Sequence, residues 1–377
     1  MKLAVVRGKF LNQYEMQSFE PLMKRYDITA FGSLTSYHDS FPFKTEKLPS
    51  PMDLPDFPYK MPVLNRLFVD AHYLLGLEQR LKGFDIVHTA ETYYHYTQQC
   101  LSAKKKGYVK KVVATVLENI PFNNEGIWGR KAFKKRSRDE LDHIIALTQK
   151  TKKSLLLEGA DPDKITVIGH GIDTKRFMPS PAHWKRLGDD KHQLTILFSG
   201  RLESYKGIFD VLEAFRILIE DTNVRKAVRL TFCGDGGEKD VLIQKMREYG
   251  LETSVQIIRV PYDEMPAIYR NADIFIAPSV STKTWEEQYC TALLEAQSMG
   301  LPIITTRSGG IPENVGDAAL YVEENNPVQL AKSLSSLIRS GIKRLSFGKK
   351  ARKRAEEVHD IRRIAKRFDN VYVNVLG

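Results

Sequence analysis

Short runs of β-branched and other apolar residues recur along the chain, and longer stretches with helical spacing separate them. Such runs are typical of strands buried on both faces of a parallel sheet, and the intervening stretches are long enough for crossover helices. The pattern predicts an α/β protein with doubly wound sheets. The predicted strands are KLAVV, DIVHT, KVVATV, HIIALT, KITVIG, LTILFSG, VRLTFCG, SVQIIRV, DIFIAPS and LPIITT.

The alternation lapses in the segment MPSPAHWKRLGDDKHQ, which contains two prolines and a polar centre. Such composition is typical of a linker, and 377 residues are more than one hydrophobic core usually carries. We therefore expect a first domain over residues 1–177, a hinge over 178–193 and a second domain over 194–354. Residues 355–377 form a charged helical pattern that fits neither sheet.

The charge of the chain favours an anionic partner, such as a nucleotide, a phospholipid surface or a nucleic acid. Lys and Arg number 57 against 46 Asp and Glu, a net charge of +11. The excess is concentrated in residues 101–160, which hold fourteen basic and six acidic side chains. We call residues 104–153 the basic segment. Two interpretations of it remain open, a surface for anionic lipid and an ordinary solvated face.

The three cysteines are Cys100, Cys233 and Cys290, and their wide spacing suggests neither a disulfide framework nor a zinc site. A reducing, cytoplasmic environment is the simplest inference. No stretch reaches the eighteen or so apolar residues of a membrane span, and the first apolar run is too short for a signal peptide. If the protein meets a membrane, we expect it to lie on the inner surface.

The loop after LTILFSG carries the first candidate chemistry. Arg201 and Lys206 follow this predicted strand, and Gly207 stands where a helix is expected to start. Ligands of open α/β sheets gather at the carboxyl ends of strands, and two cations beside a helix N-terminus suit a diphosphate. A surface loop with two solvated cations is the alternative.

Two further stretches are of interest. The turn GDGGE, which starts at Gly234, lets the backbone pass close to a ligand, although it lacks the lysine of a P-loop. The stretch EEQYCTALLEAQSMG begins like a loop, ends like a helix and carries Glu287 and Glu295. In an ordinary amphipathic helix, Glu295 would be the solvated edge. The pair Asp161 and Asp163 has the spacing of a metal-binding motif, but its place before and after a proline favours an ordinary turn.

Together these motifs resemble a known family. SGRLESYKG, CGDGG, YRNADIFIAPS, EEQYCTALLEAQSMGLPIITTRSGGIPE and the earlier VIGHGIDTKRF occur in the order and at the spacing of the retaining, nucleotide-sugar-dependent glycosyltransferases of family 4. The resemblance is strongest from about Lys164 to Val322. It implies the GT-B fold, in which two Rossmann-like domains face each other across a cleft.

The resemblance also assigns roles. It implies that Arg201 and Lys206 bind the pyrophosphate, that Glu295 binds the ribose hydroxyls and that Glu287 lies against the transferred sugar. A loop before the helix would leave its first N–H groups free for the diphosphate, so no metal or other cofactor is expected. Base selection is expected in the loop after SVQIIRV. The remaining donor-side candidates are Tyr289, Cys290, Thr291, Gly234 and Val260.

The first domain would bind the acceptor, and here the chain departs from the family. Many members have a histidine after the strand that corresponds to KVVATV, where this chain has Leu117 followed by Glu118. We take Glu118 as the candidate for a polar contact at the reacting centre. His88, Glu91 and Tyr93 are the other acceptor-side candidates. A satisfied strand-end histidine and partial core burial of the tyrosine are the alternatives.

The resemblance therefore implies a hexosyltransferase-type enzyme that moves a sugar from a nucleoside diphosphate sugar to a sugar or lipid-linked acceptor with retention. It also implies that residues 355–377 cross back to the first domain. No nucleic acid partner is expected. Alternatives are a phosphorylase-like enzyme, a nucleotide-sugar epimerase, and a non-catalytic basic protein that binds membrane or RNA.

Overall fold

The computed structural model describes all residues, 1–377, and divides them into two compact units. The first unit comprises Met1–Gly171 and Ile361–Gly377, and the second comprises Ile172–Asp360. The hinge expected over 178–193 is instead part of the second unit and contains helix α7 (Pro181–Gly188). Its proline stands at the first helical turn, where no N–H is needed, so the proline starts this helix and does not break it.

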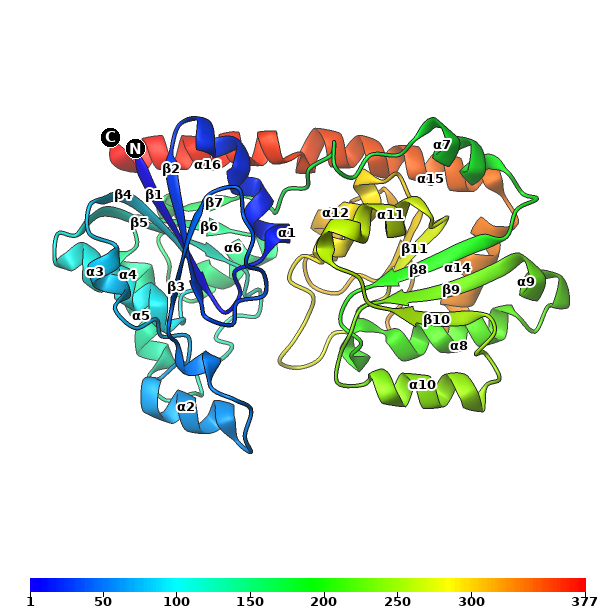
Figure 1. Ribbon diagram of the computed structural model, residues 1–377, viewed down its shortest axis with the longest axis horizontal. Coiled ribbons are helices and arrows are strands. Elements are labelled where there is room, and N and C mark those ends of the chain that lie inside the picture. Colours follow the sequence, from blue (N-terminus) through cyan, green and yellow to red (C-terminus); the bar gives the residue numbers. More distant parts are fainter. The chain divides into compact units, whose positions relative to one another are not determined.

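The first unit is built on a parallel sheet of seven strands with helices on both faces (Figure 1). The strand order is β3-β2-β1-β4-β5-β6-β7, so the chain reverses its direction of winding between β1 and β4. The strands are β1 (Lys2–Gly8), β2 (Asp27–Ser33), β3 (Lys44–Leu48), β4 (Phe84–Ala90), β5 (Val109–Val116), β6 (His143–Ala146) and β7 (Ile165–Val167).

Helices and short helical turns connect these strands. The longer helices α4 and α5 lie on either side of β5 in the sequence. The elements are α1 (Gln13–Met16), η1 (Gln17–Lys24), η2 (Pro51–Asp53), α2 (Lys60–Phe68), α3 (Leu77–Arg80), α4 (His95–Lys105), α5 (Arg130–Glu140), α6 (Gln149–Leu157) and η3 (Pro162–Lys164).

The C-terminal helix α16 (Ile361–Leu376) belongs to the first unit. Its apolar face, which includes Ile364, Phe368 and Tyr372, packs in the same core as residues of β1 and η1. The return to the first unit therefore occurs at Ile361 and not at residue 355. The four basic residues of its other face are exposed, namely Arg362, Arg363, Lys366 and Arg367.

The second unit has a parallel sheet of six strands in the order β10-β9-β8-β11-β12-β13. Its core is a cluster of aliphatic and phenylalanine side chains from the strands and from the helices that cover them. The strands are β8 (Leu194–Ser199), β9 (Val228–Cys233), β10 (Val255–Ile258), β11 (Ile274–Ala277), β12 (Ile303–Thr305) and β13 (Ala319–Tyr321).

The helices of this unit complete a doubly wound fold (Figure 1). No helix of the structure combines the length and apolar character needed to cross a bilayer. Besides α7, the elements are η4 (Ser204–Lys206), α8 (Ile208–Leu218), α9 (Thr222–Ala227), α10 (Lys239–Glu248), η5 (Tyr262–Glu264), α11 (Met265–Arg270), α12 (Thr291–Ser298), α13 (Ile311–Val315), α14 (Pro327–Ile338), α15 (Gly341–Arg354) and η6 (Ala355–His359).

The order of the second sheet fixes where its functional loops meet. β8 pairs with β9 on one side and with β11 on the other, so the chain switches its winding direction at the pair β8 and β11. At such a switch point, the loops that leave the carboxyl ends diverge and open a crevice for ligands. The loop after β8 and the loop after β11 are the two that carry Lys206 and Glu287.

Candidate functional site

The loop after β8 reaches the end of β11 because a glycine allows it. Gly207 has a φ of 75°, and a Cβ there would lie 2.1 Å from the carbonyl oxygen of Pro278. Any other residue would clash with this backbone and would also be strained at positive φ. Arg201 and Lys206 stand on this loop; the first is exposed, and the side chain of the second is 16% exposed. The predicted pair of cations is thus held at the switch point.

Lys206 forms an ion pair with Glu287. Its Nζ lies 2.6 Å from Oε2 of Glu287, and the hydroxyl of Ser279 donates to the same oxygen at 2.9 Å. Burial disfavours the charged ammonium, but the attraction of the carboxylate outweighs it and raises the pKa of Lys206 above its ordinary value. The cation is therefore permanent at neutral pH. The structure brings the predicted catalytic acid and one predicted diphosphate ligand into direct contact.

The first turn of α12 is shaped by Cys290 and Asn314. Cys290 precedes the helix with a φ of 58°, and its carbonyl accepts from the amide Nδ2 of Asn314 at 3.1 Å. The same amide donates to the carbonyl of Tyr289, whose ring is buried. The N–H groups of Cys290 and Thr291 begin the helix, so no carbonyl of an earlier turn is available to them. This helix end, with its partial positive charge, suits an anion.

Glu295 is buried on α12, with only 5% of its surface exposed. Burial raises the pKa of Glu295 to about 7, although hydrogen bonds from the hydroxyls of Tyr269 and Tyr262 and the charge of Arg176 oppose the rise. The interpretation of Glu295 as the solvated edge of an amphipathic helix is therefore wrong. A buried carboxyl group with polar partners is the arrangement that a binding role requires.

The glycine turn after β9 packs closely on the loop after β8. A Cβ on Gly234 would lie 1.9 Å from the carbonyl oxygen of Gly200. The N–H of Gly234 donates to the carbonyl of Ile258 at the end of β10, and Val260 follows two residues later, partly exposed. The carboxyl ends of β8, β9 and β10 thus lie side by side. Val260 stands at the edge where the sequence placed base selection.

Sequence reasoning missed the residues that hold the Glu287 loop. The hydroxyl of Ser308 accepts from the N–H of Glu287 at 3.1 Å and lies 2.9 Å from the hydroxyl of Ser281. Glu324 in turn accepts from the N–H and hydroxyl of Ser281, at 2.7 and 2.9 Å. The motif RSGG, which includes Ser308, was a possible signal. Glu324 follows β13, a strand too short to be predicted.

In the first unit, His88 is not a surface residue. It is fully buried, its Nδ1 lies 2.6 Å from the hydroxyl of Tyr372, and its Nε2 lies 2.7 Å from the hydroxyl of Thr115. Both ring nitrogens are used, and burial lowers the pKa of His88 well below its ordinary value. The acceptor-side assignment of His88 is therefore wrong, because the side chain joins the core between β4, β5 and α16.

Glu91 is also buried, at 2% exposure, and adopts a φ of 59°. Its Oε1 accepts from the N–H groups of Leu117 and Glu118 at 2.9 and 3.1 Å. Burial and the neighbouring Glu118 raise the pKa of Glu91 to about 8. The side chain therefore supports the loop after β5 and does not face an acceptor, which corrects its assignment as an acceptor contact.

Glu118 stays partly exposed at the carboxyl end of β5. Its carboxylate accepts from the N–H of Ile120 at 3.0 Å and from the amide of Asn123 at 2.8 Å, and burial raises its pKa. Tyr93 is 9% exposed, and the guanidinium of Arg130 lies 5.1 Å from its ring centroid. Of the four acceptor-side candidates, Glu118 is the one that the structure leaves both polar and accessible.

Ion pairs neutralise much of the basic segment. Lys134 is 1% exposed and pairs with Glu158 at 2.5 Å, and Arg130 pairs with the buried Asp70 at 2.7 Å. Lipid binding by this segment stays a prediction, with fewer unpaired charges than the sequence suggested. The other basic residues of the segment that pair with carboxylates are Lys104, Lys106, Lys110, Lys111, Lys135, Arg136 and Arg138.

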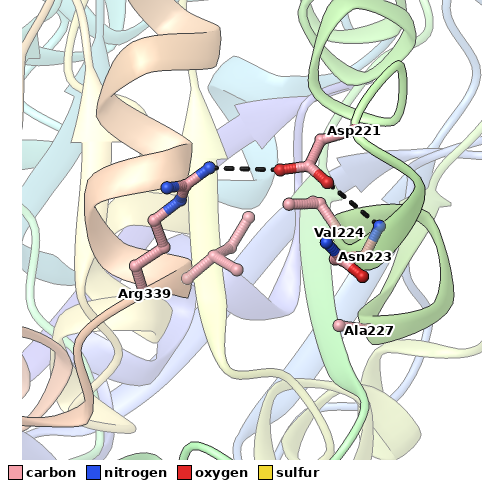
Figure 2. A pocket seen from close by; sticks show the side chains of 6 residues that line it. Asp221, Asn223, Val224, Ala227 and Arg339 are labelled. Atoms are coloured by element: carbon pink, nitrogen blue, oxygen red, sulfur yellow. Dashed lines mark hydrogen bonds and ion pairs between the residues drawn. The ribbon is translucent and has the colours of Figure 1, made fainter.

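Two other places carry none of the predicted site residues. Asp161 accepts from the N–H of Asp163 at 3.0 Å and caps the turn η3, as its place beside a proline indicated. A surface pocket beside α9 contains an ion pair between Arg339 and Asp221 at 3.2 Å (Figure 2). Because α9 leads into the amino end of β9, this pocket lies at the opposite edge of the sheet from the site.

Two doubly wound sheets, with cations, a helix N-terminus and paired glutamates at the switch point of the second, define a glycosyltransferase of the GT-B class. Comparison with known proteins gives the family. The model of the glycosyl transferases group 1 matches residues 181–354, and that of Glycosyltransferase Family 4 matches residues 30–176. The chain belongs to glycosyltransferase family 4.

Two relatives and one solved structure illustrate the similarity. The D-inositol 3-phosphate glycosyltransferase of Corynebacterium aurimucosum is 27% identical over 327 residues, which cover 82% of this chain and 72% of that protein. One subunit of the phosphatidylinositol N-acetylglucosaminyltransferase of Arabidopsis thaliana is 26% identical over 79% of this chain and 63% of its own length. The crystal structure of Anabaena HepE with UDP and glucose superposes with a TM-score of 0.77 at 17% identity, covering 99% of this chain and 100% of that one.

Proposed function

We propose that the protein transfers a sugar from a nucleoside diphosphate sugar to a hydroxyl of a sugar or lipid-linked acceptor, with retention at the anomeric carbon. The contact between Lys206 and Glu287 beside the first turn of α12 carries this proposal. It brings the ammonium of Lys206 and the carboxylate of Glu287 together close to the start of α12, which supports a site for an anionic donor. The family's named members are transferases, which supports the general class.

Each donor-site residue has a separate task. Arg201, Lys206 and the N–H groups of Cys290 and Thr291 bind the diphosphate, and Glu295 accepts hydrogen bonds from the ribose hydroxyls. These charges replace the divalent cation that other transferases use, because they stabilise the negative charge of the leaving diphosphate. Glu287 lies against the transferred sugar.

The reaction proceeds at one face of the donor. The bond between the anomeric carbon and the phosphate oxygen breaks, and its electron pair stays on the diphosphate. The acceptor oxygen bonds to the same carbon from the side of the leaving group, and its proton passes to the departing phosphate oxygen. No covalent enzyme intermediate forms. Glu118 contributes a polar contact to the acceptor from the first unit.

A thermal-shift screen with UDP, GDP, ADP and dTDP tests donor recognition. Binding at a hundredfold excess over the Kd stabilises a folded protein by about 2.7 kcal/mol, which such a screen detects. The nucleotide sugars of the stabilising base are then tested with sugar and polyol acceptors, including inositol phosphates, because two relatives are named for inositol-containing acceptors. NMR of the product gives the anomeric configuration. A product of inverted configuration, or no stabilisation by any nucleotide, contradicts the proposal.

A further inference from the structure

Two aromatic side chains lie beside the cations of the donor site, and no motif pointed to them. Tyr205 stands on η4 between Arg201 and Lys206, and Trp285 stands two residues before Glu287. Their ring centroids are 4.3 Å apart, with 53° between the planes. Both residues are partly buried. We call Tyr205 and Trp285 the aromatic pair.

The aromatic pair faces both cations. Nζ of Lys206 lies 5.0 Å from the ring centroid of Trp285 and 5.9 Å from that of Tyr205. The guanidinium of Arg201 lies 5.4 Å from the centroid of Tyr205. Within about 6 Å of a ring centroid, a cation is attracted by the negative face of the ring, most strongly by an indole. Each predicted diphosphate ligand therefore has an aromatic partner.

The loop that carries Trp285 is fixed by hydrogen bonds. The N–H of Thr282 donates to the carbonyl of Trp285 at 2.7 Å, and the N–H of Trp285 donates to the hydroxyl of Thr282 at 3.0 Å. The N–H of Val280 donates to the carbonyl of Tyr205 at 2.8 Å, which ties the two loops together. The rings are therefore held in place relative to the cations.

The aromatic pair and Glu287 attract Lys206 in different ways. Glu287 carries a full negative charge, so its 2.6 Å ion pair competes with the negative charge of a diphosphate. An aromatic face attracts a cation without any net charge, so it orients the ammonium and leaves its charge available. Neither ring belongs to the hydrophobic core of the second unit.

We propose that Tyr205 and Trp285 are positioning residues that hold Arg201 and Lys206 for the diphosphate of the donor. This inference rests on the proposed function, since it assigns the ligand of those two cations. It predicts that a side chain at position 285 that attracts the cation less strongly also weakens the binding of the nucleoside diphosphate itself. The turnover number then changes little, because the cations are still present once the donor is bound.

Fluorinated tryptophans at position 285 test the inference directly. Each added fluorine withdraws charge from the ring face and barely changes its shape, so a cation–π contact weakens stepwise while packing stays the same. We expect the logarithm of the Kd to rise linearly with fluorine number. The probe is whichever of UDP, GDP, ADP and dTDP binds the wild-type protein most tightly, and the Kd is measured by calorimetry.

Conventional variants provide the second measurement. Trp285→Leu should raise the diphosphate Kd and the donor KM by about two- to thirtyfold, the range expected from loss of one cation–π contact. The Kd and KM of Trp285→Phe should lie between those of wild type and Trp285→Leu. Those of Tyr205→Phe should resemble wild type, because phenylalanine keeps a ring face. Trp128→Leu is the control, since Trp128 is 65% exposed in the first unit.

The outcomes are distinguishable. If no diphosphate binds the wild-type protein, the proposed function fails before the inference is reached. If a diphosphate binds and its Kd is the same across the fluorinated series, the inference is wrong. Weaker binding of the nucleotide sugar with unchanged binding of the diphosphate would place the ring against the sugar, which also overturns it. Because the fluorinated rings keep the shape of tryptophan, the series remains decisive even if Trp285→Leu fails to fold.

Discussion

Replacing Arg201 by alanine separates binding from folding more cleanly than any other change at the site. Its side chain is exposed, forms no ion pair and contacts the face of Tyr205 at 5.4 Å. Exposed substitutions without buried partners usually change the free energy of unfolding by less than about 0.5 kcal/mol. We therefore expect Arg201→Ala to melt within a degree or two of wild type.

The effect on catalysis should be much larger. A charge-assisted hydrogen bond contributes roughly 1.5–3 kcal/mol, which corresponds to a loss of about 10- to 150-fold in kcat/KM. The loss in kcat/KM should exceed the loss in affinity for the diphosphate, if the contact with Arg201 strengthens as negative charge develops on the leaving group. Arg201→Lys should keep part of the activity, because it keeps the charge and loses the planar fork.

The assay is steady-state kinetics with varied donor, together with a thermal melt of each variant. Arg225→Ala is the matched control, because Arg225 is exposed on α9 in the same unit, at the opposite edge of the sheet. Kinetics of Arg201→Ala equal to those of Arg225→Ala would refute the diphosphate assignment. A melting temperature that falls in step with activity would instead show a structural role.

Three other changes test the remaining parts of the site. Lys206→Ala should lower both the melting temperature and the donor turnover, because it leaves the carboxylate of Glu287 buried without its cation. The double variant Lys206→Ala with Glu287→Gln should regain stability in thermal melts but should not regain turnover in kinetics. Glu295→Gln should mainly raise the donor KM, and the rise of wild-type kcat/KM as pH increases through about 7 should disappear in its pH profile. The pKa of Glu295 is higher in the folded protein than in the unfolded chain, so between pH 4.5 and about 7 the carboxyl group ionises more readily in the unfolded chain. The free energy of unfolding of wild type should therefore fall as pH rises over that interval. Glu295→Gln should lose less stability over the same interval, as measured by melts at several pH values. Activity should survive exhaustive treatment with EDTA, and a loss that magnesium or manganese restores would contradict the metal-free proposal.

The positions of the donor-site loops could be predicted from the sequence, because the loops that follow parallel strands all begin at the same edge of the sheet. Long apolar runs marked β8 and β11, and their carboxyl ends had to share an edge. The contact between Lys206 and Glu287 needed the structure, because 81 residues separate them and the strand order decides whether they meet.

The missed strands lacked an apolar signal. β3 reads KTEKL, an edge strand whose first four residues are exposed or only partly buried, so polar side chains suit it. β13 has three residues, too few for a pattern. β2 reads DITAFGS and has only two β-branched residues, Ile28 and Thr29, although it is buried along most of its length.

The errors in the first unit have a different cause. His88 lies near the end of β4 and Glu91 directly follows that strand, so both look accessible in sequence, but α16 covers the first and the loop after β5 covers the second. Both covering segments are distant in the chain, α16 by 284 residues at the contact with Tyr372. The local sequence pattern therefore identified polar residues at the carboxyl edge of the first sheet. It could not show which of these residues are buried by elements from elsewhere in the chain.

The most direct test of the central claim is a comparison of Glu287→Gln with wild type in two measurements, the kcat for sugar transfer and the Kd of the nucleoside diphosphate product. If Glu287 acts on the sugar as it gains positive charge, kcat should fall steeply. The diphosphate should bind at least as tightly as before, because the substitution releases Lys206 from its ion pair. Weaker diphosphate binding with an unchanged kcat would contradict the account, since it would place Glu287 on the diphosphate and not on the sugar.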